Sequence, residues 1–319
     1  MASLISVAVP VYKTEGSLYD CLLSIYQQEG VSIEIVVVND GSDRDKVETI
    51  CASLPTNAQI NVRIIHHSRN LGLLASRLTA IESATGDYLL HLDSDDSLEI
   101  NVLSNLVKYA QRNSAACLLF SINEHCDGNV NVKKFPIARD ALVTNKTEVL
   151  DAIRSSLAVE WLWHVSWNKL WKRGRLVQIL SEFQVPGHIV MYEDLLLTLF
   201  SFIQLNQDEI VILDNSTPIV NYYRNPLSVT RGQPTRASIT KNCLDTLKVV
   251  EFLRKTEGQT DSSSFNVEKM YESMINKNFP PVWLLKKYPV DYARLILKIA
   301  SAVRWRFFLQ KAYAKLTNL

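Results

Sequence analysis

The sequence has few cysteines, and it has no long hydrophobic run. Its 319 residues include five cysteines, an odd number, and no two of them have the C-x-x-C spacing typical of zinc sites. Neither a zinc site nor a disulfide framework is indicated, so a reducing compartment fits best. No apolar run approaches the roughly 18 residues that a membrane-spanning helix needs. The apolar run at residues 4–9 is too short for a signal peptide and no basic stretch precedes it, so we expect a cytoplasmic protein.

The chain also has little net charge, but the charge is unevenly distributed. The total of +1 argues against a dedicated nucleic-acid-binding protein. Residues 281–319 carry eight Lys or Arg and one Asp, a net charge of +7, which leaves −6 for residues 1–280. Apolar side chains lie among these cations, a composition that suits an amphipathic helix on the anionic inner face of a plasma membrane. Helices that pack on the rest of the protein and expose basic faces explain it equally well.

Strand and helix patterns alternate through the first hundred residues. Apolar runs at 4–9, 33–38, 62–66 and 88–92 predict strands, and helical spacing predicts helices between them, with one over 73–84 that ends near Gly86. This alternation predicts an α/β fold with a doubly wound, mainly parallel sheet. Ligands of such sheets bind beyond the carboxyl ends of the strands, which here are residues 10–13, 39–43 and 93–96.

The later sequence is less regular. It predicts helices over 102–111 and 193–204, and strands over 117–122, 130–135, 209–213 and 218–223. From about residue 236 only helices are predicted, so we place a boundary near 235 between a first domain, 1–235, and a basic helical extension, 236–319. Trp163, Trp167 and Trp171 would form one stripe if their segment were helical, a pattern more typical of a core than of a ligand platform.

Carboxylates gather at two of the three strand ends. Asp93-Ser94-Asp95-Asp96 directly follows a buried strand, where its hard oxygen ligands suit Mg²⁺ or Mn²⁺ together with a diphosphate. A turn followed by a helix cap explains the same four residues equally well. Asn39-Asp40-Gly41-Ser42 is similar: Asp40 suits a hydrogen bond from a base or a ribose hydroxyl, but the segment by itself is more typical of a turn.

Taken together, these segments resemble the inverting glycosyltransferase family 2, which has the GT-A fold. The resemblance covers roughly residues 4–231 and follows the family's order and spacing. It is carried by residues 10–12, 38–42, 70–72, 75–77, 86–88 and 93–96, and later by residues 167–171, 193–195 and 222–224. It therefore implies a GT-A-like, doubly wound sheet followed by the helical extension.

The resemblance also implies roles for individual residues. Asp93 would contact the ribose of the donor, and Asp95 would ligate a Mn²⁺ or Mg²⁺ ion on its diphosphate. Asp194 would be the catalytic base, although Glu193 suits that role as well, and either is explained by the acids favoured in a first helical turn. The remaining donor-binding residues would be Pro10, Val11, Tyr12, Asp40, Gly72, Arg77 and Ser94, and the acceptor-binding residues Trp167, Lys169 and Glu193. Many family members have Asn where this chain has Lys13, which faces either a donor phosphate or solvent.

The function predicted from the sequence is metal-dependent glycosyl transfer with inversion. The donor would be a nucleotide diphosphate sugar, with a UDP-sugar favoured, and the enzyme a hexosyltransferase or N-acetylhexosaminyltransferase. The acceptor would be a glycan or lipid-linked glycan in bacterial surface polysaccharide or lipopolysaccharide synthesis. A nucleotidyltransferase is one alternative, but its usual Gly-rich loop is absent from Val9–Lys13. A non-catalytic glycan- or nucleotide-binding scaffold is the other, and the presence of both Asp95 and Asp194 argues against it.

Overall fold

The computed structural model describes residues 3–135, 146–156, 161–185, 187, 189, 192–213 and 218–224, together with residues 245, 248, 249 and 252. All the helices and strands named below belong to one compact unit, formed by Met1–Ile189 and Glu193–Asn225. Val190–Tyr192 and Pro226–Leu319 form a second unit. Apart from residues 245, 248, 249 and 252, the predicted helical extension, with its basic segment 281–319, lies outside the described residues, and the boundary near 235 stays a prediction.

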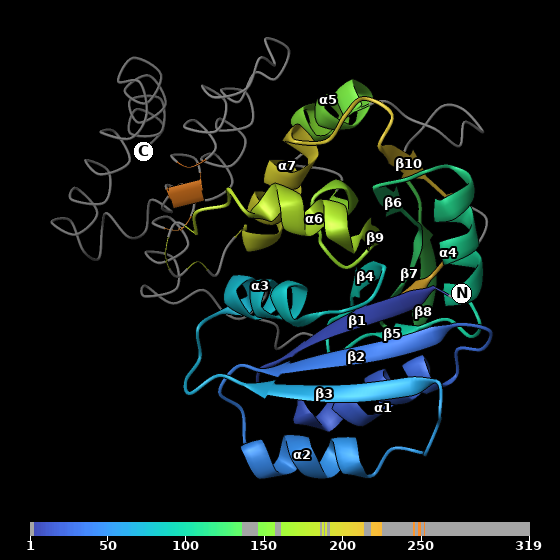
Figure 1. The fold of residues 1–319 in the computed structure, drawn as a ribbon, viewed down its shortest axis with the longest axis vertical. Coiled ribbons are helices and arrows are strands. Elements are labelled where there is room, and N and C mark those ends of the chain that lie inside the picture. Colours follow the sequence, from blue (N-terminus) through green and yellow to red (C-terminus); the bar gives the residue numbers. More distant parts are fainter. Residues whose placement is uncertain are drawn as a thin grey trace, which may run out of the picture. The chain divides into compact units, whose positions relative to one another are not determined.

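A large, mainly parallel sheet forms the centre of the first unit (Figure 1). Its seven strands lie in the order β10-β6-β9-β4-β1-β2-β3. Six of them are parallel, and β9 runs antiparallel to both of its neighbours, β4 and β6. Their bounds are β1 Leu4–Val11, β2 Ser32–Asn39, β3 Ile60–His66, β4 Tyr88–His91, β6 Cys117–Leu119, β9 Lys169–Lys172 and β10 Ile210–Ile212. The predicted GT-A-like, mainly parallel sheet is therefore confirmed.

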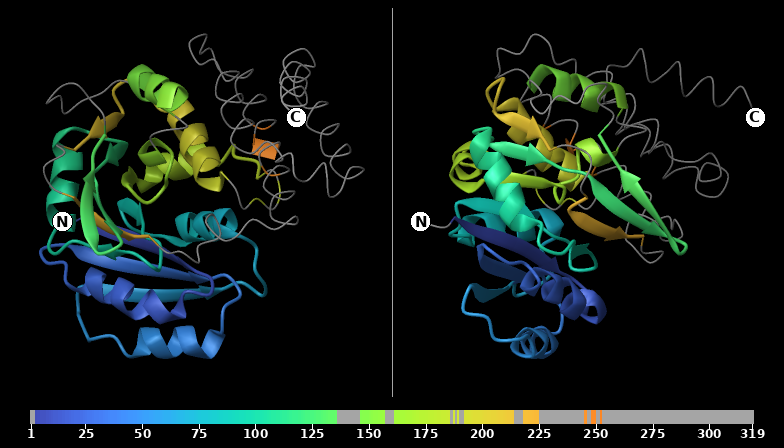
Figure 2. Two further views of the ribbon diagram at one scale, coloured as in Figure 1. Left: turned by 180° about the vertical axis from the view of Figure 1, so that it is seen from behind. Right: turned by 90° about the vertical axis from the view of Figure 1, so that its right-hand side faces the viewer.

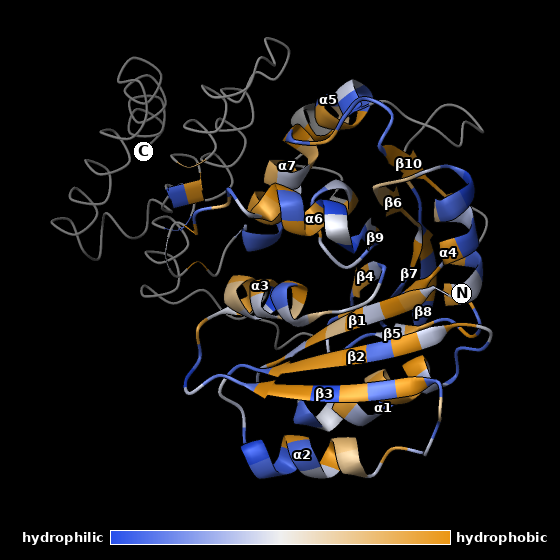
Figure 3. Ribbon diagram, in the orientation of Figure 1, coloured by the Kyte–Doolittle hydropathy of each residue, from blue (hydrophilic) through white to orange (hydrophobic). Residues whose placement is uncertain are grey.

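Helices cover both faces of this sheet. Helices α1 and α2 lie on one face of β1–β3 and α3 on the other, as Figures 1 and 2 show. Strands β1 and β2 are buried on both faces and are mostly apolar, as the orange stretches of Figure 3 show. Their polar residues Ser6 and Glu34 are paired with each other by a hydrogen bond of 2.6 Å. The helices are α1 Glu15–Tyr26, α2 Arg44–Ala52, α3 Leu73–Ser83, α4 Leu103–Arg112, α5 Lys146–Ser156, α6 Arg173–Leu180 and α7 Glu193–Ile203, with a 3₁₀ turn at Trp161–Trp163.

The strand order reverses between β1 and β4. From β1 the chain passes outward to β2 and β3, and it then returns to place β4 on the other side of β1. Loops that leave two such strands diverge to opposite faces of the sheet, which opens a crevice at their carboxyl ends. Residues 12–14 follow β1 and residues 92–96 follow β4, so the fold brings two of the predicted ligand segments to this crevice.

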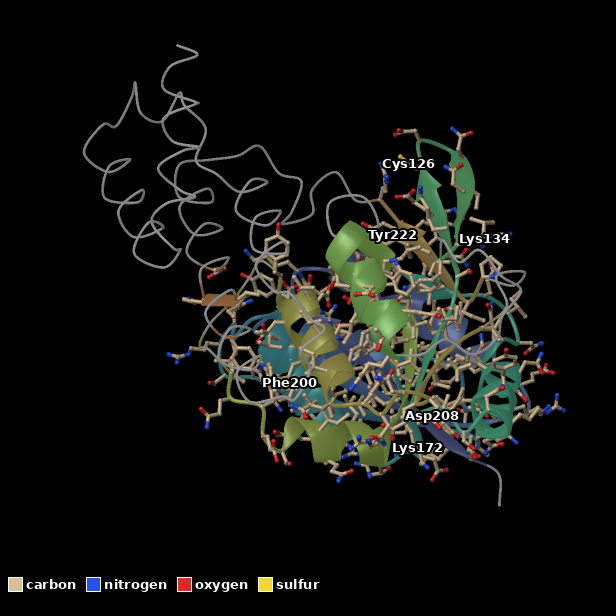
Figure 4. The ribbon with its side chains drawn as sticks, turned by 90° about the horizontal axis from the view of Figure 1, so that it is seen from above. Cys126, Lys134, Lys172, Phe200, Asp208 and Tyr222 are labelled. Carbon is tan, nitrogen blue, oxygen red and sulfur yellow. The ribbon has the colours of Figure 1, made fainter. Side chains whose placement is uncertain are left out.

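A second, four-stranded sheet adjoins the loop that follows β4. Its order is β5-β11-β7-β8, with β5 Ser97–Leu98, β7 Ile122–Cys126, β8 Asn129–Lys133 and β11 Val220–Tyr223. Strands β7 and β8 form a hairpin, and Figure 4 shows Cys126 near its turn and Tyr222 on the neighbouring strand. Because β5 begins directly after Asp96, this sheet is tied to the carboxylate loop.

The structure corrects three details of the predicted pattern. The predicted strand 117–122 splits at Phe120 and Ser121, so that β6 enters the large sheet and β7 the small one. The Trp-rich segment is not one helix but the 3₁₀ turn followed by β9. Gly86 is not the helix stop, because α3 is capped by Ala84. Glycine is needed there since a Cβ at residue 86 would lie 2.7 Å from the backbone nitrogen of Ser6.

Among the described residues, no helix combines the length and the apolar character needed to span a bilayer.

Candidate active site

The loops after β1 and β4 are joined by side-chain hydrogen bonds at the crevice. The hydroxyls of Thr14 and Ser94 lie 2.6 Å apart, and Ser17 donates to the carbonyl oxygen of Ser94 at 3.0 Å. The Cys21 thiol donates to the carbonyl oxygen of Asp93 at 3.6 Å. Ser17 and Cys21 belong to α1, so this helix fixes the backbone of the carboxylate loop.

Asp40 has its carboxylate turned into the protein. It is 2% exposed, and its two oxygens accept hydrogen bonds from the backbone nitrogens of Leu71 and Gly72, each at 2.8 Å. The imidazole of His67 lies 2.7 Å from the same carboxylate. The structure thus shows Asp40 holding the segment that leads into α3, while its contact with a nucleoside stays a prediction.

We expect Asp40→Ala to lower the free energy of unfolding by about 3 kcal/mol, because the change removes the carboxylate that accepts from the backbone nitrogens of Leu71 and Gly72 and contacts His67. Urea denaturation measures this. The matched control is Asp43→Ala, which removes the N-cap of α2, whose side chain accepts from the backbone nitrogen of Lys46, and should cost about 1 kcal/mol. Equal losses for the two variants would show that the Asp40 contacts contribute little.

Residue 13 has an unusual backbone conformation. Lys13 has φ of 59°, in the left-handed region that Asn adopts more readily than Lys. Its backbone nitrogen donates to the Ser42 hydroxyl at 2.8 Å, and its ammonium lies 5.1 Å from the centre of the Tyr12 ring. The left-handed turn accounts physically for the Asn that is common here in the resembling family. Tyr12, which is 41% exposed, lies open at the end of β1, while Pro10 and Val11 are buried in it.

The three carboxylates after β4 differ in their surroundings. Asp93 is paired with Arg77, and desolvation raises the pKa of Asp93 to about 6. Asp96 is 2% exposed and accepts from the backbone nitrogen of Tyr223 at 2.9 Å, and burial raises its pKa. Asp95 is partly exposed and, within the described part of the chain, pairs with no cation. Its electrostatic neighbours are the other two carboxylates.

This arrangement fits a divalent cation that is shared with a substrate. Oxygen ligands suit Mg²⁺ and Mn²⁺, and such ions commonly take one or two protein carboxylates and complete their coordination with phosphate oxygens and water. No group of three His, Cys, Asp or Glu side chains suited to a metal occurs among the described residues. Asp95 is the carboxylate of this loop best placed to be a ligand, because Asp93 is paired with Arg77 and Asp96 is buried.

Arg77 connects this loop to the start of α7. Its Nη2 donates to Asp93 Oδ1 at 3.0 Å, and its Nη1 donates to Asp194 Oδ1. The same nitrogen lies 3.9 Å from Glu193 Oε1. Ser166 also donates to Asp194 Oδ1, at 2.7 Å. The fold thus brings Asp93 together with Glu193 and Asp194, an adjacent pair that lies far from Asp93 in the sequence.

Glu193 is poised to hold a proton near neutral pH. Its side chain is 12% exposed, and burial, with the neighbouring charge of Asp194, raises the pKa of Glu193 to about 8. A carboxyl group with a raised pKa binds more protons in the folded than in the unfolded state between pH 4.5 and 8. Stability from this group is therefore lost as pH rises through that window.

Glu193→Gln should remove this dependence. We expect wild-type stability to fall from pH 5 to pH 8 more steeply than that of Glu193→Gln, by on the order of 1 kcal/mol per pH unit. Chemical denaturation at each pH measures the difference. Parallel curves for the two proteins would contradict the raised pKa of Glu193.

Two predicted acceptor-binding residues are buried. Lys169 is fully buried, and its ammonium donates to the carbonyl oxygens of Val165 and Leu162 and to Asn168 Oδ1. All three N–H donors of the ammonium are used within the protein, and none is left for a ligand. The predicted contact of Lys169 with an acceptor substrate therefore does not fit this structure. Burial lowers the pKa of Lys169 to about 7.

Trp167 is likewise only 3% exposed, and its ring stacks on that of Tyr222 with centroids 5.0 Å apart. Trp163 and Trp171 are also buried, in agreement with the core interpretation of the three tryptophans.

The structure adds residues that sequence reasoning missed. His67 and Ser166 hold Asp40 and Asp194, respectively. His91 is 1% exposed, and burial, together with the Arg77 charge, lowers the pKa of His91 to about 3, so it is neutral. The sequence offered little sign of these roles: His67 lies close to the motif segment 70–72, and Ser166 directly precedes Trp167. Each of these side chains acts through a contact with a distant segment, which no local pattern reveals.

The comparison with known families decides the identity of this region. Residues 6–158 match the model described as Glycosyl transferase family 2. These residues are a family 2 glycosyltransferase domain. The matched segment includes the loops after β1, β2 and β4 and the whole of α3, so the crevice and Arg77 belong to the family 2 domain.

Curated relatives are similar over the same region. Glycosyltransferase GlyG of Streptococcus pneumoniae is 31% identical over 131 residues, which cover 40% of this chain and 43% of the relative. An N-acetylglucosaminyltransferase of Bradyrhizobium elkanii is 35% identical over 113 residues, which cover 34% of this chain and 59% of the relative. The chain thus matches less than two thirds of the length of these relatives.

A solved structure shares the fold of the family 2 domain over a longer stretch. TarS 1–349 of S. aureus superposes with a TM-score of 0.62 at 18% sequence identity, over 86% of this chain and 71% of that chain. At this level of identity the similarity shows the fold, and it supports the GT-A-like architecture described above.

Proposed function

We propose that the chain is an inverting, metal-dependent glycosyltransferase that moves a sugar from a nucleotide diphosphate donor to an acceptor hydroxyl. The observation that carries this proposal is the meeting of Asp93, Asp194 and Glu193 around Arg77 at the carboxyl edge of β4. The carboxylate loop 93–96 lies where a donor diphosphate would bind, and the carboxylates of Glu193 and Asp194 lie beside it. Membership of the family 2 domain supports the reaction class.

The donor we propose is a UDP-sugar, held at the crevice between the loops after β1 and β4. Tyr12 offers an exposed aromatic face, and Asp93 offers a carboxylate for the ribose. Gly72 caps the start of α3, where φ of 98° requires glycine. Structures of TarS, whose fold this chain shares, are described as complexes with UDP-GlcNAc and with UDP, which favours uridine.

A Mn²⁺ or Mg²⁺ ion on Asp95 would act as a Lewis acid that offsets the charge of the leaving nucleoside diphosphate. The protein's own part is to keep Asp95 partly exposed and, among the described residues, unpaired with any cation, while Asp93 is paired with Arg77 and Asp96 is buried. Ser94 contributes through its hydroxyl contact with Thr14, which closes the loop over the end of β1.

Asp194 is our proposed base. Its Oδ1 is held by Arg77 and Ser166, which leaves Oδ2 for the acceptor hydroxyl. A single displacement with inversion needs one such base and no protein nucleophile. Glu193, beside it, would contact the acceptor.

We further propose a glycan or lipid-linked glycan as the acceptor, in bacterial surface polysaccharide or lipopolysaccharide synthesis. The proposed place of action is the inner face of the plasma membrane, reached through the basic segment 281–319. The names of the curated relatives support sugar transfer, and the charge of +7 on this segment supports attraction to anionic lipid.

A turnover assay tests the proposed reaction. The full chain is given UDP-glucose, UDP-galactose, UDP-GlcNAc, UDP-GalNAc or GDP-mannose with Mn²⁺ or with EDTA, and nucleoside diphosphate release is followed. We expect one UDP-sugar to be turned over with metal only, and NMR of the product to show inversion at the anomeric carbon. Nucleotide binding without release would favour the non-catalytic scaffold. Pyrophosphate release from a nucleoside triphosphate and a sugar phosphate would favour the nucleotidyltransferase.

A further inference from the structure

Arg77 is buried beneath the site. Its side chain is 1% exposed although it lies next to three carboxylates that are 24%, 12% and 19% exposed: those of Asp93, Glu193 and Asp194. One terminal nitrogen donates to Asp93 and the other to Asp194. The carboxylates therefore lie between the guanidinium and the open side of the site, and a bound donor would meet them before it met Arg77.

The sequence predicted that Arg77 helps to hold the donor, and its buried position does not fit that role. Both terminal nitrogens are engaged by carboxylates, and the remaining nitrogen, Nε, is buried without a hydrogen-bond partner. A guanidinium presents its donors in a fixed planar fork, so two carboxylates bound to different arms are held at a set separation. Lysine carries the same charge but lacks this fork.

We propose that Arg77 is a positioning residue that holds the donor-side carboxylate Asp93 and the base Asp194 at the separation that in-line attack requires. This inference rests on the proposed function, because it takes Asp194 as the base. Asp93 follows β4 and Asp194 begins α7, and these two segments are joined here by the Arg77 side chain, which lies on α3. Arg77 thus acts on the reaction through its two partners and touches no substrate.

Arg77 is also the cation that sets the electrostatic environment of Asp194. The charged and titratable groups that act on this cluster, among the described residues, are Arg77, Asp93, Asp95 and Glu193, together with Lys169 from β9. Burial lowers the pKa of Lys169 to about 7, so near neutral pH its charge is incomplete. Arg77 stays charged, and it contacts the Asp194 carboxylate directly.

Steady-state kinetics of Arg77→Lys in the full chain tests the proposal, with UDP-sugar and acceptor varied separately. We expect kcat to fall by about 30-fold while the KM for the donor changes by less than about 3-fold, because a misplaced base slows the chemical step without weakening donor binding. In Arg77→Gln, loss of the cation should move the acidic limb of the kcat–pH profile upward by about one pH unit. If Arg77→Gln does not fold, kcat and the donor KM of Arg77→Lys test the proposal without it.

The matched control is Arg175→Lys, since Arg175 also binds a carboxylate, Glu209, and a carbonyl oxygen, that of Gln204, away from the site. It should keep the wild-type kcat. A rise in donor KM with unchanged kcat in Arg77→Lys would make Arg77 a donor ligand and overturn the proposal. So would a wild-type kcat, or a loss of kcat equal to that of Arg175→Lys. Turnover by the wild-type protein is measured before the variants. If it is absent, the proposed function is overturned, and this inference with it.

Discussion

Replacing Asp194 by Asn should lower kcat by about 10³-fold while leaving nucleotide affinity close to that of the wild type. The amide has the shape of the carboxylate and still accepts from Ser166 and Arg77, but it cannot take a proton from the acceptor hydroxyl. Loss of a general base typically costs 10²–10⁴-fold. Steady-state kinetics with saturating donor measures the loss, and calorimetric titration with UDP measures the affinity.

Two variants serve as controls for this result. Asp208→Asn changes an exposed acid in the turn before β10, labelled in Figure 4, and it should leave kcat unchanged. Glu193→Gln separates the two candidate bases. A loss of about 10³-fold in Glu193→Gln, with a much smaller loss in Asp194→Asn, would show that Glu193 is the base instead.

Asp95→Ala should abolish the dependence of the enzyme on metal. Electrostatic stabilisation of a leaving group by a metal ion is worth several kcal/mol, so we expect kcat/KM for the donor to fall by about 10³-fold. The variant should bind UDP equally weakly with Mn²⁺ and with EDTA, because the loop no longer holds the ion that would join it to the diphosphate. Kinetics and calorimetric titration with and without metal measure both effects.

Asp20→Ala is the matched control for Asp95, since Asp20 is an exposed acid on α1. It should retain both metal dependence and turnover. If Asp95→Ala kept the wild-type response to Mn²⁺, the carboxylate loop would hold no metal, and Asp95 would be left with the role of a turn residue.

Much of the fold could be predicted because local patterns and burial agree in the first hundred residues. Strands such as Ile33–Val38 are apolar at every position but Glu34, and that pattern occurs where a parallel strand is covered on both faces. The split between β6 and β7 was missed because the apolar run 117–122 continues through the point where the chain changes sheets.

The site was harder to predict than the fold because its residues act through distant contacts. The resemblance to the family implied that Asp93, Arg77 and Asp194 share one site, but not that Arg77 lies beneath the two acids. Lys169 was predicted to contact an acceptor because it belongs to the resembling segment 167–171. Its burial depends on three acceptors supplied by the turn at 162–168, which no local pattern reveals.

Thermal unfolding with nucleotides tests the central claim most directly, namely that the crevice between the loops after β1 and β4 binds a nucleoside diphosphate with a metal. The full chain is heated with UDP, GDP, CMP or dTDP, each with Mn²⁺ or with EDTA. A ligand at 100 times its Kd adds about 2.7 kcal/mol of stability. We predict stabilisation by UDP that requires Mn²⁺ and is absent in Asp95→Ala. Failure of every nucleotide to stabilise the protein under either condition would contradict the account.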